Sequence, residues 1–406
     1  MSEKLKIQMR EWRSGLILIF VIGIIARLVL TNIVYSFDAA SFVIWAKYLV
    51  NHRLADLFEF LPAGYTPYPP IYYYVLKVLG KTIEFFGWWK PDWLAYLLIK
   101  IPVFTADIIV ASLVYHFTLK YLSKTDALWA TGFYFLHPAI IYNTSVWGQI
   151  DSIIIAMGLV SIMLIFQKKI FPGLLFYLLD VLTKLQSLAM LPLILFLAVV
   201  ETPFKKTLRL LPWIILIGIL PFIPVVWVKG FKWTWDYFFT IPNWYAYTSV
   251  YTYNLWAPFG FIVTDNSKFL GLVQFKYLGI VLFWLAAVLI LYPLRKKANR
   301  TPLMYMFAAF LLWYDFSYFA TRIHSRYLIY SFGFFAPFFR RFPGIGILLS
   351  ILMIADFLLP NKNPALVWLV DWLNQPITIV TFVIYAGGLF VLSYHAYQKL
   401  TKITHA

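Results

Sequence analysis

The 406-residue chain contains no cysteine and few charged residues. Without cysteine, disulfide bonds and thiolate metal sites are excluded. Charged residues make up 13% of the sequence, against roughly 25% in an average soluble domain, and 62% of the residues are hydrophobic. This composition excludes an ordinary water-soluble globular protein. The six histidines lie far apart and none belongs to a His-Glu-x-x-His pattern, so we expect no dedicated zinc site.

Long apolar segments recur along the whole chain, and several approach or exceed the roughly 20 residues that span a bilayer. The sequence therefore predicts an all-α polytopic integral membrane protein. The first apolar run, Gly15 to Tyr35, is followed by no small-residue cleavage site, so we expect a retained span and not a signal peptide. The formal charge of +17 is spread over short clusters between apolar runs, which indicates cytoplasmic loops and argues against nucleic acid as a partner.

The distribution of lysine and arginine predicts how the chain crosses the membrane. The basic residues before the first span place the N-terminus in the cytoplasm. Counting Ile71 to Phe86 as a span would send most later basic clusters outside, so we expect this segment to lie on the membrane. We expect about 12 transmembrane helices, the third at about residues 127–142, and cytoplasmic termini. In the first outer loop, Phe42, Trp45 and Leu49 share one face, as in an interfacial helix.

The sequence shows no internal repeat, low-complexity tract or separate soluble domain. We expect one transmembrane domain over residues 1–406, with an N-terminal module at about 15–200 and a C-terminal module at about 208–398. Arg27 and Asp107 fall near the middle of the first two spans, where charge is expensive. We therefore expect these two side chains to pair or to face a wet interior.

Acidic residues open two predicted helices on the outer side. Asp38 follows the first span, and Asp151 begins the fourth, directly after Trp147 and Gln149. Each aspartate can cap the helix that follows it, and each can serve as a general base toward a hydroxyl group. The two roles are compatible. If helix packing draws the two acids together, they line one outer cleft.

Basic residues also occur in outer loops, against the usual charge bias. The segment "TRIHSRYL" contains Arg322, His324 and Arg326. Arginines at that depth can contact lipid head groups, but three donors within five residues can also bind a phosphate. Lys184, in "LTKLQSL", can bind an anionic substrate, or it can extend to the interface or pair with Asp180 four residues earlier.

Prolines and aromatic residues mark other outer segments. "YTPYPPIYY" carries three prolines, which predict a fixed extended turn in place of an ordinary helix. Such a turn is a plain connector or a loop that shapes a pocket. Tryptophans such as Trp147 and Trp256 can stack on a sugar ring, whereas most aromatics at this depth are membrane anchors.

Taken in order, these segments resemble the GT-C class of membrane glycosyltransferases, which use a polyprenyl-phosphate-linked sugar as donor. The resemblance covers residues 37 to 328 and rests on "FDAASFVIWAKYL", "YTPYPPIYYY", "WGQIDS" with "LTKLQSL", and "YNLWAPFG" with "TRIHSRYL". It is nearest to bacterial and archaeal mannosyltransferase-like members and to the eukaryotic dolichyl-phosphate-glucose and -mannose transferases. Ser325 stands where the family often has glutamate in His-Glu-Arg-Tyr, and the eukaryotic His-rich counterpart of the second-loop motif is absent. The sugar and the acceptor therefore stay open.

The resemblance implies a GT-C fold and an inverting transfer of a hexose, mannose or glucose, at the exterior face of the plasma membrane. The acceptor would be a hydroxyl of a glycan, glycolipid or protein, with no cofactor and no catalytic metal. Asp38 would take the acceptor proton, while Asp151 and Gln149 position the acceptor or the sugar. Basic residues would hold the donor phosphate as its charge grows: Arg322, His324, Arg326 and Lys184. The other substrate-contacting residues would be Tyr68, Trp147, Gln186, Trp256 and Tyr327.

Two other functions fit the same composition. A transporter, or a flippase for lipid or glycolipid, would line a path with its embedded charges and would show pseudo-symmetric halves. A ligase or polymerase that acts on polyprenyl-diphosphate glycans would share the outer basic cleft. The sequence shows neither a repeat nor a polar cytoplasmic half, which favours the transferase over the transporter.

Overall fold

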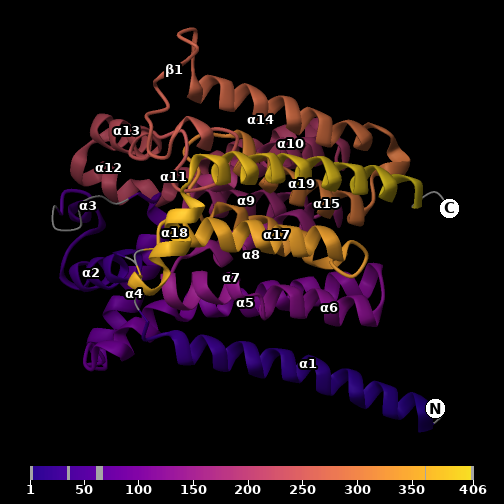
Figure 1. Ribbon diagram of the computed structural model, residues 1–406. Coiled ribbons are helices and arrows are strands. Elements are labelled where there is room, and N and C mark those ends of the chain that lie inside the picture. Colours follow the sequence, from indigo (N-terminus) through magenta and orange to yellow (C-terminus); the bar gives the residue numbers. More distant parts are fainter. Residues whose placement is uncertain (1–2, 34–36, 61–66, 362, 404–406) are drawn as a thin grey trace. The chain divides into compact units, whose positions relative to one another are not determined.

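The protein is mainly helical (Figure 1) and divides into two compact units. A computed structural model describes residues 3–33, 37–60, 67–361 and 363–403. The chain is 79% helical, so the expected all-α class is confirmed. Unit 1 comprises Met1–Leu119, Ser123–Leu188 and Leu197–Trp244, and unit 2 comprises Lys120–Leu122, Ala189–Phe196 and Tyr245–Ala406. The expected modules at about 15–200 and 208–398 stay a prediction.

Unit 1 consists of α-helices joined by short helical turns. In chain order these elements are α1 (Glu3–Leu30), α2 (Phe37–Asn51), α3 (Leu54–Leu57), α4 (Pro70–Phe85), α5 (Asp92–Tyr121), α6 (Lys124–Phe135), α7 (Pro138–Ile141), the π-helical turn η2 (Tyr142–Trp147), α8 (Asp151–Phe166), α9 (Ile170–Thr183), α11 (Phe204–Ile219), η4 (Leu220–Phe222), α12 (Ile223–Lys229), α13 (Phe231–Thr240) and η5 (Ile241–Asn243). Two further elements, η3 (Leu185–Met190) and α10 (Leu191–Val200), contribute residues to both units, as does α5, whose last two residues belong to unit 2.

Unit 2 combines helices with one short antiparallel hairpin. Its elements are η6 (Ala257–Phe259), β1 (Lys268–Phe269), β2 (Val273–Gln274), α14 (Phe275–Leu291), η7 (Tyr292–Arg295), η8 (Lys297–Asn299), α15 (Pro302–Phe319), η9 (Tyr327–Ile329), α16 (Tyr330–Phe335), η10 (Ala336–Phe338), α17 (Pro343–Leu358), η11 (Pro364–Leu366), α18 (Val367–Leu373) and α19 (Pro376–Ile403). In the hairpin, Lys268 pairs with Gln274.

The apolar helices are those of an integral membrane protein. Among the described residues, five helical segments are long and apolar enough to cross a bilayer: Trp12–Leu30, Asp92–Tyr121, Lys205–Lys229, Phe275–Arg295 and Pro376–Thr401. Shorter apolar helices accompany them, for example Asp151–Phe166, Ile170–Thr183 and Pro343–Leu358. The expected count of about 12 spans stays a prediction.

The segment expected to form the third span is broken into two helices. α6 ends at Phe135, and α7 starts at Pro138. Pro138 lacks a backbone N–H and disfavours helical geometry at the residue before it, so His137 is extended with ψ 126°. The expectation of one continuous helix over about residues 127–142 is therefore wrong.

The Tyr-Pro-Pro segment starts a helix. Pro69 is extended, with ψ 165°, and Pro70 is the first residue of α4. Proline is favourable there because its missing N–H would have no partner in the first helical turn. The predicted extended turn is therefore found only up to Pro69, and Tyr72 and Tyr73 lie on an ordinary helix.

Of the two arrangements expected for the mid-span charges, pairing or a wet interior, the structure shows pairing. Arg27 Nε donates to Asp107 Oδ2 at 2.7 Å, and both side chains are buried. The guanidinium also donates to the carbonyl of Phe135 at 3.0 Å. Tyr134 and Ser152 donate hydroxyl hydrogen bonds to Asp107 Oδ1. This network ties α1, α5, α6 and α8 together and compensates both charges inside unit 1.

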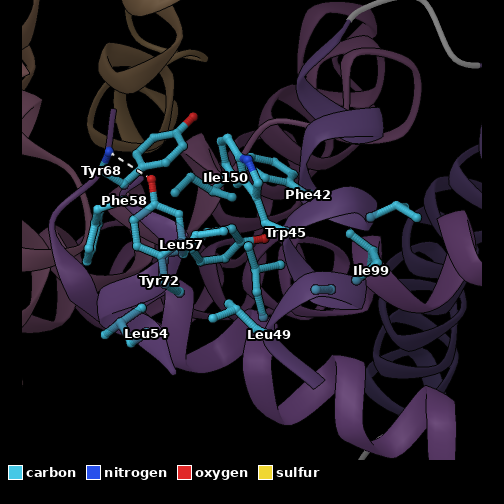
Figure 2. Close-up of a cluster of buried hydrophobic side chains, with 14 of the residues drawn as sticks. Phe42, Trp45, Leu49, Leu54, Leu57, Phe58, Tyr68, Tyr72, Ile99 and Ile150 are labelled. Atoms are coloured by element: carbon cyan, nitrogen blue, oxygen red, sulfur yellow. Dashed lines mark hydrogen bonds between the residues drawn. The ribbon is translucent and has the colours of Figure 1, made fainter. Parts of the chain in front are cut away.

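A cluster of buried side chains, many of them aromatic, joins α2, α3 and α4 (Figure 2). Phe42, Trp45 and Leu49 share one face of α2, as expected, and all three are buried. They pack against Tyr72 and the rest of α4, with ring centres of Phe42 and Tyr72 5.2 Å apart. The apolar face of α2 therefore packs against protein, not against lipid as the interfacial-helix prediction required. This packing sets the position of the start of α2.

In unit 2, α15 is buried along almost its whole length. Thr301 caps the helix by accepting a hydrogen bond from the Met304 N–H, and Pro302 occupies its first position. Side chains from Met304 to Asp315 are all buried. α15 packs against α14, α16 and α19 of the same unit. It therefore forms the core around which the C-terminal helices are arranged.

Replacing Gly80 with alanine tests the close packing of α2 on α4. A Cβ at Gly80 would lie under 3.0 Å from the backbone of Ala46, which cannot move as a side chain can. We expect Gly80→Ala to lower the free energy of unfolding by about 1–3 kcal/mol. Thermal unfolding of the purified chain in detergent measures the change.

Gly388→Ala is the matched control because a Cβ there meets nothing within 4 Å. In a helix this substitution should be neutral or stabilising by up to about 1 kcal/mol. Equal unfolding temperatures for Gly80→Ala and Gly388→Ala would contradict the close approach of the two helices.

Candidate functional site

The short turn from Trp147 to Asp151 connects the elements that hold the predicted acids. The π-helical turn η2 ends at Trp147, and Gly148 has a left-handed backbone with φ +76°. A Cβ at Gly148 would lie 2.7 Å from the Cβ of Ala39 on α2. Glycine is thus required twice, for its backbone conformation and for the close approach of α2.

The close approach brings Asp38 to Trp147. Asp38 is the second residue of α2, so it lies inside the first turn and not at the N-cap position that the sequence suggested. Its Oδ2 accepts a hydrogen bond of 2.6 Å from Trp147 Nε1. Trp147 is almost fully buried, whereas Asp38 is partly exposed. The indole therefore orients a carboxylate that solvent can still reach.

Asp151 belongs to a second, buried network. It is the first residue of α8 and forms an ion pair with Lys184 Nζ. Its other oxygen accepts from Asn143 Nδ2 at 3.1 Å. Gln149 Oε1 accepts from Lys184 Nζ at 3.4 Å and from the Tyr68 hydroxyl at 3.3 Å. The structure thus brings together four of the predicted site residues: Tyr68, Gln149, Asp151 and Lys184.

Burial determines what this network can do. Gln149 and Asp151 are 0% exposed and Lys184 is 3% exposed. A buried pair of opposite charges holds together because either charge alone would be strongly destabilised. The charge of Lys184 is therefore balanced by Asp151, and the alternative pairing of Lys184 with Asp180 is not found. The pair stabilises Gln149 and α8, while Asp38 is the more accessible acid.

Gln149 retains an unused donor inside this network. Its Nε2 has no acceptor among the described residues although the side chain is fully buried. Buried polar groups are nearly always hydrogen-bonded, so an unpaired amide indicates a ligand or a water molecule at that position. Gln186, in η3, is partly exposed.

The aromatic cluster holds Tyr68 in place. Its ring lies 6.0 Å from that of Phe42 and 6.2 Å from that of Trp45, centre to centre. The backbone N–H of Tyr68 donates to the Tyr73 hydroxyl at 3.3 Å (Figure 2). Lys184 Nζ lies 5.9 Å from the Tyr68 ring centre. The packing of α2 and α4 thereby places the Tyr68 hydroxyl against Gln149.

Sequence reasoning missed Lys100, which lies next to this turn. Lys100 is 1% exposed and its Nζ donates to the carbonyls of Thr31, at 2.8 Å, and Ser145. A Cβ at Gly148 would lie 3.2 Å from Lys100 Cε. The available signal was a lysine within an otherwise apolar predicted span, where charge normally has a function.

In unit 2, the guanidinium of Arg322 is bound to a carboxylate. Arg322 donates to both oxygens of Asp265, at 2.7 Å and 3.3 Å, and Thr321 donates to the same carboxylate at 2.9 Å. Asp265 is fully buried and was missed because the sequence around it resembles a plain loop. The bidentate geometry predicted for a phosphate is used here by Asp265.

The other predicted residues of unit 2 lie around the same segment. His324 contacts the ring of Tyr245, with centres 4.4 Å apart. Arg326 is 8% exposed and its guanidinium lies 5.6 Å from the ring centre of Tyr327. Trp256 is buried and donates its indole N–H to the carbonyl of Phe319 at 2.8 Å. A structural role fits Trp256 better than stacking on a sugar.

The predicted site residues thus form two groups, one in each unit. Asp38, Asp151 and their neighbours belong to unit 1, and the arginines belong to unit 2. Their convergence around one outer chamber stays a prediction. Across the described part of the chain, no three His, Asp or Glu side chains are grouped as a metal site would require.

Comparison with known proteins adds no family assignment. No protein-family model matches the chain, and no curated protein matches it. The resemblance to membrane glycosyltransferases therefore rests on the motifs of the sequence.

Removing either partner of the buried ion pair should destabilise the protein. Lys184→Met leaves Asp151 buried without its counter-charge, which costs about 3–5 kcal/mol. The double variant Lys184→Met/Asp151→Asn should recover most of that loss, because neither charge remains buried. A double-mutant cycle on thermal unfolding in detergent measures the coupling energy.

The exposed pair Lys232–Asp236 is the matched control, with side chains 90% and 57% exposed. Its coupling in the cycle Lys232→Met/Asp236→Asn should be about 0.5 kcal/mol or less. A coupling energy at Lys184–Asp151 as small as this would refute the buried pair.

Proposed function

We propose that the protein is a glycosyltransferase of the GT-C type that transfers a hexose from a polyprenyl-phosphate carrier to a hydroxyl acceptor. In this proposal the chain has about 12 spans and cytoplasmic termini, and the reaction takes place at the exterior face of the plasma membrane. The observation that carries the proposal is that one five-residue turn, Trp147–Asp151, joins Asp38 to the network of Gln149 and Lys184. Such a site combines an accessible carboxylate with buried supporting groups.

Asp38 is the general base of the proposed reaction. Its carboxylate takes the proton of the acceptor hydroxyl while the hydroxyl oxygen bonds to the anomeric carbon of the donor. The bond from that carbon to the phosphate oxygen breaks, and its electron pair stays on the phosphate. Attack opposite the leaving group inverts the anomeric centre. Trp147 supports this step because its indole N–H holds one carboxylate oxygen.

Gln149 and Asp151 support substrate binding. The unpaired Nε2 of Gln149 is a donor for a hydroxyl of the sugar or acceptor. Asp151 and Lys184 neutralise each other and fix the Gln149 carboxamide, so we assign them positioning roles. Tyr68 holds the same carboxamide from the other side.

The donor phosphate is assigned to the basic segment of unit 2. Its negative charge grows as the glycosidic bond breaks, so cationic donors stabilise the transition state more than the ground state. The candidates are Arg322, His324 and Arg326, of which Arg322 also donates to Asp265. The lipid tail of the donor requires apolar helix surfaces, which the exposed side chains of the long apolar helices provide.

Transfer in proteoliposomes tests the proposal. The full chain is reconstituted with polyprenyl-phosphate-mannose or -glucose and alkyl-glycoside acceptors, and release of polyprenyl phosphate is followed with product formation. We expect Asp38→Asn to lower the transfer rate by at least about a hundredfold. Asp92→Asn is the control, since Asp92 is also acidic in a first helical turn but its side chain is 69% exposed.

The outcomes separate the alternatives. Full activity of Asp38→Asn would remove Asp38 as the base. Transfer only from a diphosphate-linked glycan would replace the proposal by a ligase or polymerase. Movement of the donor across the bilayer without a new glycosidic bond would replace it by a flippase.

A further inference from the structure

Unit 2 contains a small polar cavity that the proposed reaction does not use. Its volume is about 10 Å³, which is room for about one water-sized sphere. α15, α17, α19 and the loop before η6 surround it. The polar residues that line it are Thr252, Tyr253, Tyr314, Ser317, Tyr318 and Asp356.

Asp356 is the charged residue at this cavity. It is 2% exposed, and its two oxygens accept hydrogen bonds of 2.8 Å from the Thr252 hydroxyl and from the Tyr253 N–H. Both donors are neutral. In the described parts of the chain, Asp356 forms no salt bridge with a lysine, arginine or histidine. A buried carboxylate without a counter-charge is costly, so it either takes up a proton or pairs with a cation.

The hydroxyl groups of the lining residues donate their protons in hydrogen bonds to other groups of the protein. Tyr253 donates to the carbonyl of Leu373 at 2.9 Å, and Ser317 donates to that of Trp313 at 2.9 Å.

The two cavity-lining tyrosines of α15 also donate their hydroxyl protons to backbone carbonyls. Tyr314 donates to the carbonyl of Ala386 at 2.9 Å, and Tyr318 donates to that of Val383 at 3.2 Å. Thr252 donates to Asp356. Each of these hydroxyl oxygens therefore has no proton available for a group in the cavity. Its lone pairs can accept a hydrogen bond or bind a cation.

Two helix ends add to the negative potential. Ser317 and Tyr318 lie in the last turn of α15, and Asp356 lies in the last turn of α17. The carbonyl groups at the C-terminal end of a helix carry a partial negative charge, which favours a cation. Charge, ligand atoms and helix ends thus act in the same direction.

We propose that this cavity binds one alkali cation, Na⁺ or K⁺. Oxygen ligands suit hard cations, and one carboxylate balances one positive charge. A divalent ion is a poorer fit, because a single carboxylate leaves half of its charge uncompensated. The bound ion ties the loop at Thr252 and Tyr253 to α17 and α15. This site is independent of the proposed transferase reaction.

Thermal unfolding of the full chain in detergent tests the cation site. Sodium or potassium chloride is titrated at constant ionic strength against the chloride of an organic cation, N-methyl-D-glucamine. We expect a saturable rise in Tm with the alkali cation, of about 3 °C when its concentration is a hundred times its Kd. An unchanged Tm in all three salts would overturn the proposal and leave the cavity to water.

Variants of unit 2 locate the ion. Asp356→Asn should abolish the rise in Tm. Asp315→Asn is the matched control. Asp315, on α15, is a buried carboxylate like Asp356 but does not line the cavity, so this variant should keep the rise in Tm. An equal response of Asp356→Asn and the unaltered chain would overturn the proposal.

Two further measurements decide the question if Asp356→Asn does not fold. Ser317→Ala removes one lining hydroxyl and leaves the hydrogen bonds of Asp356 intact, so it should weaken the apparent affinity several-fold. Equilibrium binding of radioactive ²²Na⁺ or of ⁸⁶Rb⁺, as a potassium substitute, to the unaltered chain should give one ion per chain. Finding no saturable binding of either ion would overturn the site.

Discussion

The close contact between the turn at Gly148 and the start of α2 is the constraint on which the candidate site depends. No other residue type combines a φ of +76° with a Cα lying this near Ala39. Because α2 can approach, Trp147 contacts Asp38, and the same short turn then directs Gln149 and Asp151 toward Lys184. A short stretch of chain thus connects α2 with α8 and α9.

Buried charge is handled in two ways in this protein. In unit 1, Arg27 pairs with Asp107 and Lys184 pairs with Asp151, so each of these four embedded charges has an opposite neighbour. Pairing is the expected solution where water is excluded, because an isolated ion would lose its hydration without replacement. Asp356 of unit 2 differs, since only neutral groups donate to it among the described residues. This difference separates structural ion pairs from a carboxylate that can bind a ligand.

The contacts also divide the predicted site residues by role. Asp38 is partly exposed and its carboxylate is held by one indole, which suits a reacting group. Asp151 and Lys184 neutralise each other in the interior, which suits a support for Gln149. Arg322 donates to Asp265, so this arginine of the "TRIHSRYL" segment has a structural contact in addition to its proposed role in phosphate binding. The proposed chemistry therefore needs fewer reacting residues than the sequence motifs suggested.

The sequence by itself determined the membrane-helical class and restricted Arg27 and Asp107 to two arrangements, pairing with each other or facing a wet interior. Long apolar runs must satisfy their backbone hydrogen bonds within helices, and a charge in such a run needs a partner. Tertiary structure alone decided which partner each outer residue found. Lys184 has Asp180 four residues away, yet it pairs with Asp151, which lies far from it in the chain. Asp265 was missed because its partner Arg322 is 57 residues away in the chain. Periodicity identifies neighbours along one helix, whereas contacts between helices depend on packing, such as that of α2 at Gly148, which no local pattern encodes.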